Sequence, residues 1–366
     1  MKITRFKCRL IHLPGGSIAP QPKGVPVQSH YFVALELGTD EGVEGIGISS
    51  CGDVLAGALK SAVDTLTALT VGMDPLRIEA ILAKLRGAAV GAGPGGIFTT
   101  ALAAIDIALW DIRGKAFGQP VWKLAGGHRE RVPVYASGAL MRHFPVEHNV
   151  KTATLLKKQG WKQMKTQLGA PAGQSWTPGE EVDRIARVRA AAGDDIDLMC
   201  DINQLWSVHR ALDIGRRIAF ANLYWLEDVV AHDDYAGLGR VNAELRTPIA
   251  GGEYVYGDVP FRHMIEARSV DIVMIDVLRS GGVTGWLKIA HMAQAFNLPV
   301  VSHLAPEIQV HLVAALPNGL TVEYMPWSVG LYEEVPVMKD GMISPPMKPG
   351  FGLKFDRKAL KKYGVD

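Results

Sequence analysis

The sequence has few cysteines, no long apolar run and no excess of either charge. Cys8, Cys51 and Cys200 are an odd number at wide spacing, which fits reduced thiols in the cytoplasm better than a disulfide framework. No stretch reaches the ~20 apolar residues of a membrane-spanning helix, and residues 1–7 lack the apolar part of a secretory signal. The sequence has 39 basic and 37 acidic residues, and the basic ones form no block. No nucleic-acid-binding surface is therefore expected. We therefore expect a cytoplasmic protein with neither a membrane nor a nucleic-acid partner.

The length of 366 residues, 48% of them hydrophobic, suffices for about two domains with buried cores. Residues 1–50 read as strands, whereas residues 55–85 and 99–117 have helical spacing. Proline and glycine gather in residues 14–22 and predict a mobile loop between strands. The first third is therefore expected to be an α+β domain.

A glycine-rich stretch at residues 91–96 has the letters of the dinucleotide motif G-x-G-x-x-G. That motif requires a strand immediately before it, but residues 82–90 are helix-like. A loop between helices is the favoured interpretation, and neither a P-loop nor an H-E-x-x-H zinc motif occurs.

After residue 131 the sequence alternates short apolar runs with amphipathic stretches. Such a repeated strand–helix unit is typical of a barrel of parallel strands, and a doubly wound open sheet is the alternative. The barrel is favoured because the runs end in polar residues. The expected strands are residues 132–137, 163–168, 197–201, 223–227, 249–253, 272–276, 300–303 and 321–323.

Three of these strands end in an acid at equal spacing. Asp201, Glu227 and Glu253 lie 26 residues apart, so consecutive parallel strands would bring one carboxylate each to the same end of the barrel. A single acid after a strand is more often a helix cap or a solvated loop residue. Three at equal spacing, with Asn203 nearby, predict a Mg²⁺ site.

The same series of strand ends continues on both sides of the acids. Asp276 lies 23 residues after Glu253, and His303 lies 27 residues after Asp276. An Asp beside a His on the next strand predicts a carboxylate that orients an imidazole general base. Glu323 ends the following strand, and Lys165 lies at the end of the strand before Asp201. A lysine on the surface is the alternative for Lys165.

Several longer motifs resemble those of the enolase superfamily, and within it those of the mandelate racemase subgroup. They are AIDIALWDIRGK at residues 104–115, GQP at 118–120, LAGG at 124–127, GGVTG at 281–285 and SHL at 302–304. The resemblance covers nearly the whole chain. It implies a (β/α)7β modified TIM barrel at residues 126–330, an α+β capping domain at residues 1–125, and a segment at residues 331–366 that completes the capping domain.

The resemblance also assigns roles to individual residues. The metal ligands would be Asp201, Glu227 and Glu253, the catalytic dyad Asp276 and His303, and the electrophilic acid Glu323. A protonated Glu323 would donate a hydrogen bond to the enediolate, supplementing the metal and Lys165. The resemblance further implies a homo-oligomer.

The sequence departs from the patterns of particular relatives at three strand ends. The racemase has Lys-x-Lys at the end of its second strand, and the second lysine is the base for the opposite face, whereas this chain has Gln167 there. Lactonising and dipeptide-epimerising relatives have a lysine base on the sixth strand, where this chain has Asp276. The usual Glu-Glu-Pro after the fourth strand is replaced at residues 227–230, which predicts a different loop path.

A site with a base on only one face of the substrate predicts a one-way elimination rather than racemisation. We expect a Mg²⁺-dependent acid-sugar dehydratase, a lyase of sugar-acid breakdown: His303 removes the proton α to a carboxylate, and the β-hydroxyl leaves to give a 2-keto-3-deoxy acid. The alternatives are a racemase or epimerase of a 2-hydroxy acid, with Lys165 as second base, and a non-catalytic barrel. Expected contacts to the sugar come from the loop at residues 14–30 and from the following side chains: Asn203, Gln167, Arg279 and Ser50.

Overall fold

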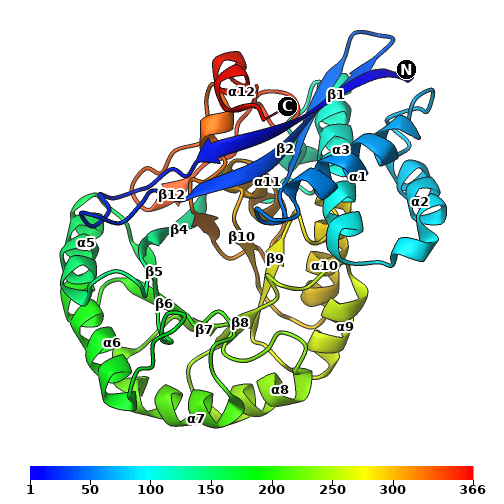
Figure 1. Cartoon of the computed structure of the whole chain (residues 1–366). Coiled ribbons are helices and arrows are strands. Elements are labelled where there is room, and N and C mark those ends of the chain that lie inside the picture. The colour runs from blue at the N-terminus through cyan, green and yellow to red at the C-terminus, as the bar shows by residue number, and fades with distance from the viewer. Residues whose placement is uncertain (366) are drawn as a thin grey trace.

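The computed structural model describes residues 1–365, which form an N-terminal sheet with helices and a barrel of parallel strands (Figure 1). The N-terminal sheet is antiparallel in the order β1 (Ile3–Pro14), β2 (Ser29–Thr39) and β3 (Glu44–Ser49). The stretch expected to be helical at residues 55–85 is divided into α1 (Ala56–Ala68) and α2 (Ile78–Ala88). Gly72, at a φ of 84°, and Pro75 separate them, because neither residue continues a helix.

The long helix α3 (Gly96–Ala116) packs its backbone directly on the N-terminal sheet. A Cβ atom on Gly47 of β3 would lie 1.9 Å from the carbonyl oxygen of Ala104, so only glycine permits this approach. The glycine-rich stretch at residues 91–96 begins within the short 3-10 helix η1 (Val90–Ala92), which follows α2, and ends at the first residue of α3. It is therefore a connection between helices, as the sequence predicts, and no strand precedes it.

The barrel has eight parallel strands and seven helices in strict alternation, which confirms the predicted (β/α)7β fold. The strands run in spatial order from β4 to β10, and β11 lies beside β4. The amide of Leu320, just before β11, donates to the carbonyl of Val300 in β10 at 2.8 Å and brings the two ends of the sheet together. The strands are β4 (Val132–Leu140), β5 (Gln163–Gln167), β6 (Asp197–Asp201), β7 (Trp225–Glu227), β8 (Ile249–Gly251), β9 (Ile272–Asp276), β10 (Val300–His303) and β11 (Val322–Tyr324).

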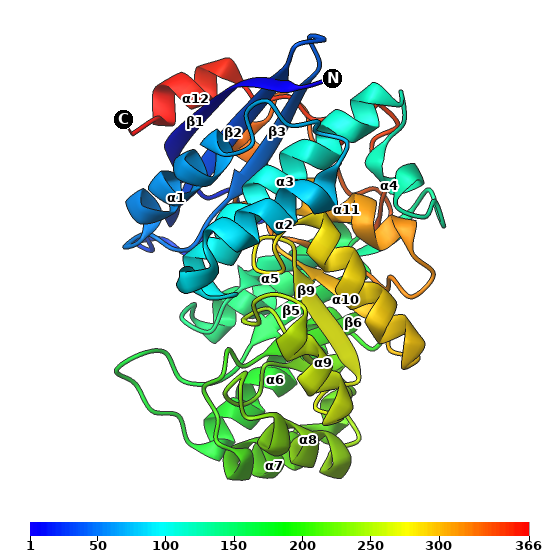
Figure 2. The ribbon, with the colours of Figure 1, turned by 90° about the vertical axis from the view of Figure 1, so that its right-hand side faces the viewer.

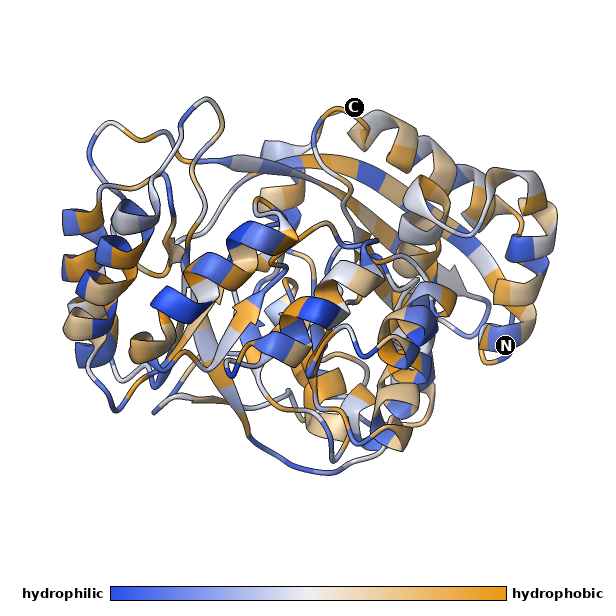
Figure 3. Ribbon diagram, turned by 90° about the horizontal axis from the view of Figure 1, so that it is seen from below, coloured by the Kyte–Doolittle hydropathy of each residue, from blue (hydrophilic) through white to orange (hydrophobic). Residues whose placement is uncertain are grey.

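The helices surround the strands as an outer layer (Figure 1). Hydrophilic and hydrophobic residues alternate along them (Figure 3), as expected for helices with one buried face. No helix within residues 1–365 has the length and hydropathy of a membrane span. The helices are α5 (Val146–Lys158), α6 (Pro178–Ala192), α7 (Val208–Arg217), α8 (Tyr235–Glu244), α9 (Val259–Glu266), α10 (Val283–Ala295) and α11 (Pro306–Ala315).

The segment after the barrel returns to both parts of the molecule. Strand β12 (Met342–Ile343) pairs with β4 of the barrel, while α12 (Arg357–Tyr363) lies beside β1 of the N-terminal sheet (Figure 2). The amide of Val365 donates to the carbonyl of Leu10 at 2.9 Å. The short helix α4 (Val121–Leu124) connects α3 to the barrel. The boundaries at residues 125 and 330 remain predictions.

A buried polar cluster joins α3 to the first turn of α10. The Thr284 hydroxyl donates to Oδ1 of Asp106 at 2.5 Å and accepts from Nε1 of Trp110 at 2.9 Å. The Thr284 amide donates to Oδ2 of Asp106 at 2.9 Å. Burial raises the pKa of Asp106 to about 7, although these hydrogen bonds oppose the shift. This cluster fixes the N-terminal domain, called the cap below, on the barrel.

Candidate active site

The carboxyl ends of the barrel strands open toward the cap, and the polar residues at these ends lie side by side. Gln167 of β5 is the register partner of Asp201 in β6, and Asp201 is the partner of Glu227 in β7. On the other side of the barrel, Asp276 of β9 is the partner of His303 in β10. The strand-end series read from the sequence therefore converges on one end of the barrel, called the barrel mouth below.

Three buried acids bring oxygen atoms close enough to share a cation. One carboxylate oxygen each from Glu227, Asp228 and Glu253 lies within 4.8 Å of the others. Burial raises the pKa values of Glu227 and Asp228, and repulsion from neighbouring carboxylates raises them further. The Oδ2 atom of Asp228 is buried without a hydrogen-bond partner among the described residues. This all-oxygen donor set suits a hard divalent cation such as Mg²⁺.

Asp228 belongs to this group of acids, although the strand-end pattern predicts only Glu227 at this position. The available signal was the pair of consecutive acids, but in a strand successive side chains point to opposite faces. At a φ of 42° the backbone of Asp228 has left the strand conformation, so both carboxylates reach the mouth. Glu253 also differs from expectation, since β8 ends at Gly251 and Glu253 lies in the loop beyond it.

Asp201 lies at the mouth but outside this group of oxygens. Its Oδ1 accepts from the amide of Asn203 at 2.8 Å, and its Oδ2 accepts from Nε2 of Gln167 at 3.3 Å. Gln167 also donates to Oδ1 of Asn203 at 3.1 Å, and Arg142 donates to the same oxygen at 2.7 Å. The structure thus brings Gln167 and Asn203 together with Asp201, in a network that holds this carboxylate.

Lys165 is buried at the centre of the mouth rather than on the surface. Its Nζ lies 2.5 Å from Oε1 of Glu227 and 2.8 Å from Oε1 of Glu323. It also lies 5.5 Å from the ring centroid of Tyr135. The two buried carboxylates therefore compensate the charge of this buried ammonium.

The neighbours of Glu323 bear on its protonation state. Burial opposes the ionisation of Glu323, but Lys165 and His303 outweigh it and lower its pKa to about 2. Its Oε2 accepts from the amide of Leu304 at 2.7 Å. The surroundings of Glu323 therefore favour its ionised form, and a protonated Glu323 beside a bound substrate remains a prediction.

The Asp276–His303 pair has the geometry of an oriented base. His303 Nδ1 lies 2.7 Å from Oδ2 of Asp276, and its Nε2 lies 3.3 Å from Oε2 of Glu253. Burial favours the neutral ring, but Glu253 and the hydrogen bond that Nδ1 donates to Asp276 together raise the pKa of His303 above its usual value. The amides of Leu278 and Arg279 donate to Oδ1 of Asp276 and fix its position. The ring nitrogen remote from Asp276 therefore faces the carboxylate cluster.

Two further predicted contact residues line a pocket beside the dyad. Ser50 and Arg279 share a cavity of about 180 Å³ with Asp276. Arg279 Nη1 donates to the carbonyl of Glu253 at 2.6 Å, and the Ser50 hydroxyl donates to the carbonyl of Tyr31 at 2.8 Å. Their contact with a substrate remains a prediction.

Family models match both parts of this chain. The model described as Mandelate racemase / muconate lactonizing enzyme, N-terminal domain, matches residues 22–126. The model described as Enolase C-terminal domain-like matches residues 149–359, which include the barrel from α5 onward and most of the segment after it.

The chain belongs to the enolase superfamily. Within the superfamily, L-talarate/galactarate dehydratase of Salmonella typhimurium is 31% identical over 340 residues, or 92% of this chain and 83% of that protein. The 3,6-anhydro-alpha-L-galactonate cycloisomerase of Streptomyces coelicolor is 32% identical over 91% of both chains.

A solved enolase-superfamily structure has the same architecture with ligands bound. L-talarate dehydratase from Polaromonas, complexed with Mg and L-glucarate, superimposes with a TM-score of 0.91 at 29% identity, over 100% of this chain and 98% of that one. The resemblance seen in the sequence motifs is therefore confirmed at the level of the family and of the fold.

Proposed function

We propose that this protein is a Mg²⁺-dependent acid-sugar dehydratase in which His303 is the base. The observation that carries the proposal is the Asp276–His303 pair, held at 2.7 Å and directed toward a cluster of buried carboxylates. Dehydration is also the reaction named for several relatives, including arabinonate dehydratase of Saccharolobus solfataricus, 28% identical to this chain.

The metal would be held by carboxylates at the barrel mouth. We infer that Glu227 and Glu253 bind it directly and that Asp201, oriented by Gln167 and Asn203, completes the set. Asp228 adds negative charge beside them. When bound, Mg²⁺ would withdraw electron density from the substrate carboxylate and so make the α-proton more acidic.

The side chains divide the reaction into proton removal and charge stabilisation. His303 takes the α-proton at Nε2, because Nδ1 is held by Asp276. The ammonium of Lys165 lies where negative charge develops on the substrate carboxylate, and Glu323 holds that ammonium in place. Loss of the β-hydroxyl as water, with a proton supplied by the site, gives an enol that tautomerises to a 2-keto-3-deoxy acid.

A racemase would need a base on the opposite face of the substrate. Gln167 cannot act as this base, because its amide is not basic and donates hydrogen bonds to Asp201 and Asn203. Lys165 is the remaining candidate, but it is paired with two carboxylates. The arrangement therefore favours a one-base elimination over racemisation.

Proton exchange in D₂O tests this proposal. A series of acid sugars is incubated with Mg²⁺ and followed by NMR for α-proton exchange and for 2-keto acid. We expect both signals for one C2 configuration, their loss in His303→Asn, and exchange largely retained in the matched variant Gln167→Ala. Exchange of both C2 epimers by the wild type would establish a two-base racemase instead, and formation of an isomer without water loss would establish a cycloisomerase.

A further inference from the structure

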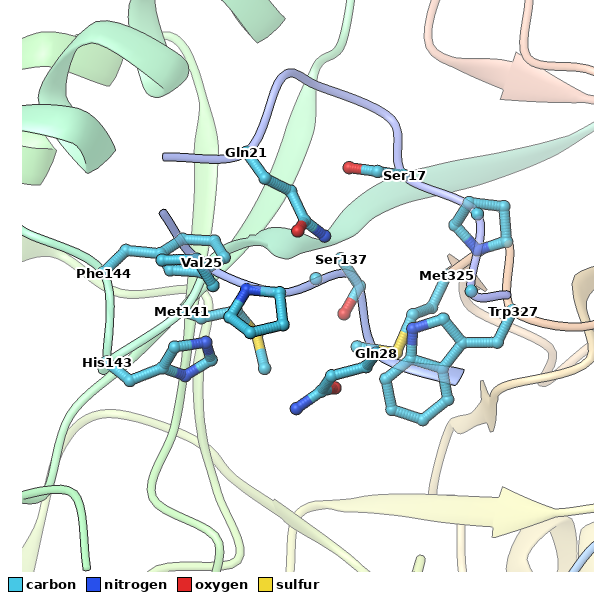
Figure 4. Close-up of a pocket in the computed structure, with 15 residues that line it drawn as sticks. Ser17, Gln21, Val25, Gln28, Ser137, Met141, His143, Phe144, Met325 and Trp327 are labelled. Carbon is cyan, nitrogen blue, oxygen red and sulfur yellow. The ribbon is translucent and has the colours of Figure 1, made fainter. Parts of the chain in front are cut away.

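A narrow pocket lies between the cap and the barrel, close to the mouth. It is enclosed by the loop at residues 15–28, between β1 and β2, and by the ends of β4 and β11. Gln21 and Ser137 point into it from these two sides, and Trp327 forms one wall (Figure 4). Its volume of about 30 Å³ admits a small end group but not a bulky one. This site is called the distal pocket below.

We propose that the distal pocket binds the end of the substrate farthest from the reacting carboxylate, and that this end is an uncharged hydroxymethyl group. The substrate is then a monocarboxylic acid sugar rather than a dicarboxylic one. This inference rests on the proposed function and narrows it.

The distal pocket adjoins the catalytic residues through shared walls. Trp327 lines both the distal pocket and the 180 Å³ cavity that contains Asp276, and its ring stacks on His30 at a centroid distance of 3.9 Å. Ser137 lies two residues after Tyr135 in β4, so both side chains are on the same face of the strand. Tyr135 is the residue whose ring faces Lys165. A substrate at the mouth therefore reaches the distal pocket along β4.

Two buried polar atoms of this pocket have no partner among residues 1–365. They are Oγ of Ser137, whose residue is 2% exposed, and Oε1 of Gln21. A buried polar atom without a partner costs about 1–3 kcal/mol, so both atoms are expected to bind a ligand group. A hydroxyl can donate to Gln21 Oε1 and accept from the Ser137 hydroxyl, whereas a carboxylate can only accept and leaves Oε1 unpaired unless the amide turns to present Nε2.

The charges around the pocket also favour a neutral end group. No lysine or arginine lines it within the described part of the chain. Burial and the nearby Arg142 lower the pKa of His143, and burial lowers the pKa of His30, so neither imidazole supplies a positive charge at neutral pH. The guanidinium of Arg142 is directed to Asn203 and to the carbonyl of Asp201. A carboxylate in the pocket would lose its hydration without a countercharge.

The loop that closes the pocket is fixed by its backbone. The amide of Gly15 donates to the carbonyl of Gln28 at 2.7 Å, which closes the loop on itself. A Cβ atom on Gly16 would lie 2.3 Å from the carbonyl oxygen of Pro326, so the loop approaches the barrel closely only because this position is glycine. The position of Gln21 over Ser137 therefore follows from packing of the cap on the barrel.

Steady-state kinetics with matched substrates test the inference. Pairs of six-carbon acids with the same configuration from C2 to C5, one ending in a hydroxymethyl group and the other in a carboxylate, are compared with Mg²⁺ present. We expect kcat/KM to be at least 10²-fold higher for the best monoacid than for its diacid. We expect Ser137→Ala and Gln21→Met each to lower kcat/KM for the monoacid about tenfold, mainly through KM. Gln21→Lys should shift the preference toward the diacid.

Different results would contradict the neutral distal pocket and the dehydratase function. Efficient turnover of a diacid, with its monoacid partner inactive, overturns the neutral pocket while the dehydratase stands. Wild-type kinetics in both Ser137→Ala and Gln21→Met also overturn the pocket. If no acid sugar of either kind exchanges its α-proton in D₂O, the proposed function fails, and the pocket assignment fails with it.

Discussion

Replacement of Thr284 by valine is expected to weaken the contact between the cap and the barrel and so to lower the free energy of unfolding. Valine has nearly the volume of threonine but no hydroxyl, so the change removes hydrogen bonds and leaves the packing. Nε1 of Trp110 loses its acceptor at 2.9 Å, and Oδ1 of Asp106 loses its donor at 2.5 Å. Both groups are buried, and each orphaned group costs about 1–3 kcal/mol. The expected loss in the free energy of unfolding is therefore about 2–6 kcal/mol.

Urea unfolding followed by tryptophan fluorescence and circular dichroism measures this loss. Thr284→Ser is the matched control, because serine keeps the hydroxyl that Asp106 and Trp110 share and loses only a methyl group. A Thr284→Val protein within about 0.5 kcal/mol of Thr284→Ser, the range of ordinary surface substitutions, would refute the role assigned to this cluster.

Three other changes have defined outcomes. Glu227→Gln should weaken Mg²⁺ binding at least tenfold by calorimetry with the fold retained, and unchanged affinity would remove Glu227 from the site. Asp276→Asn should lower kcat at least 10²-fold by disturbing the orientation of His303, and a near-normal kcat would contradict the dyad. Asp106 has a folded pKa of about 7, so the native state retains a proton that the unfolded chain loses from about pH 4. Wild-type stability should therefore fall relative to Asp106→Asn by up to ~1.4 kcal/mol per pH unit between about pH 4 and 7, and the difference should stay constant above; parallel urea-unfolding curves at pH 5 and 8 would contradict this.

The barrel and most of its mouth could be predicted from the sequence. Each apolar run had to form a strand buried on both faces, so the polar residue ending it had to lie where the strand leaves the core. For this reason Asp201, Asp276 and His303 end β6, β9 and β10 at the expected positions. Parallel register then brings Asp276 and His303 side by side.

The remaining features depend on geometry beyond the strands. Asp228 reaches the mouth because its backbone turns at a φ of 42°, which the sequence pattern does not indicate. The lowered pKa of Glu323 follows from its position 2.8 Å from Lys165, and the spacing of residues along the chain does not determine distances between side chains on different strands. The distal pocket joins Gln21 to Ser137, which are far apart in the chain and meet only after the cap has packed on the barrel.

The return of the segment after the barrel to β1 has a consequence for synthesis on the ribosome. The isolated bridge between Ile11 and Gly364, with the Val365–Leu10 hydrogen bond, pairs residues made early with residues made more than 350 positions later. The β1 edge of the N-terminal sheet therefore lacks this partner while the barrel strands are being translated. Its pairing closes a loop that contains the entire barrel, so the nascent chain can gain this contact only after all the barrel strands have been translated.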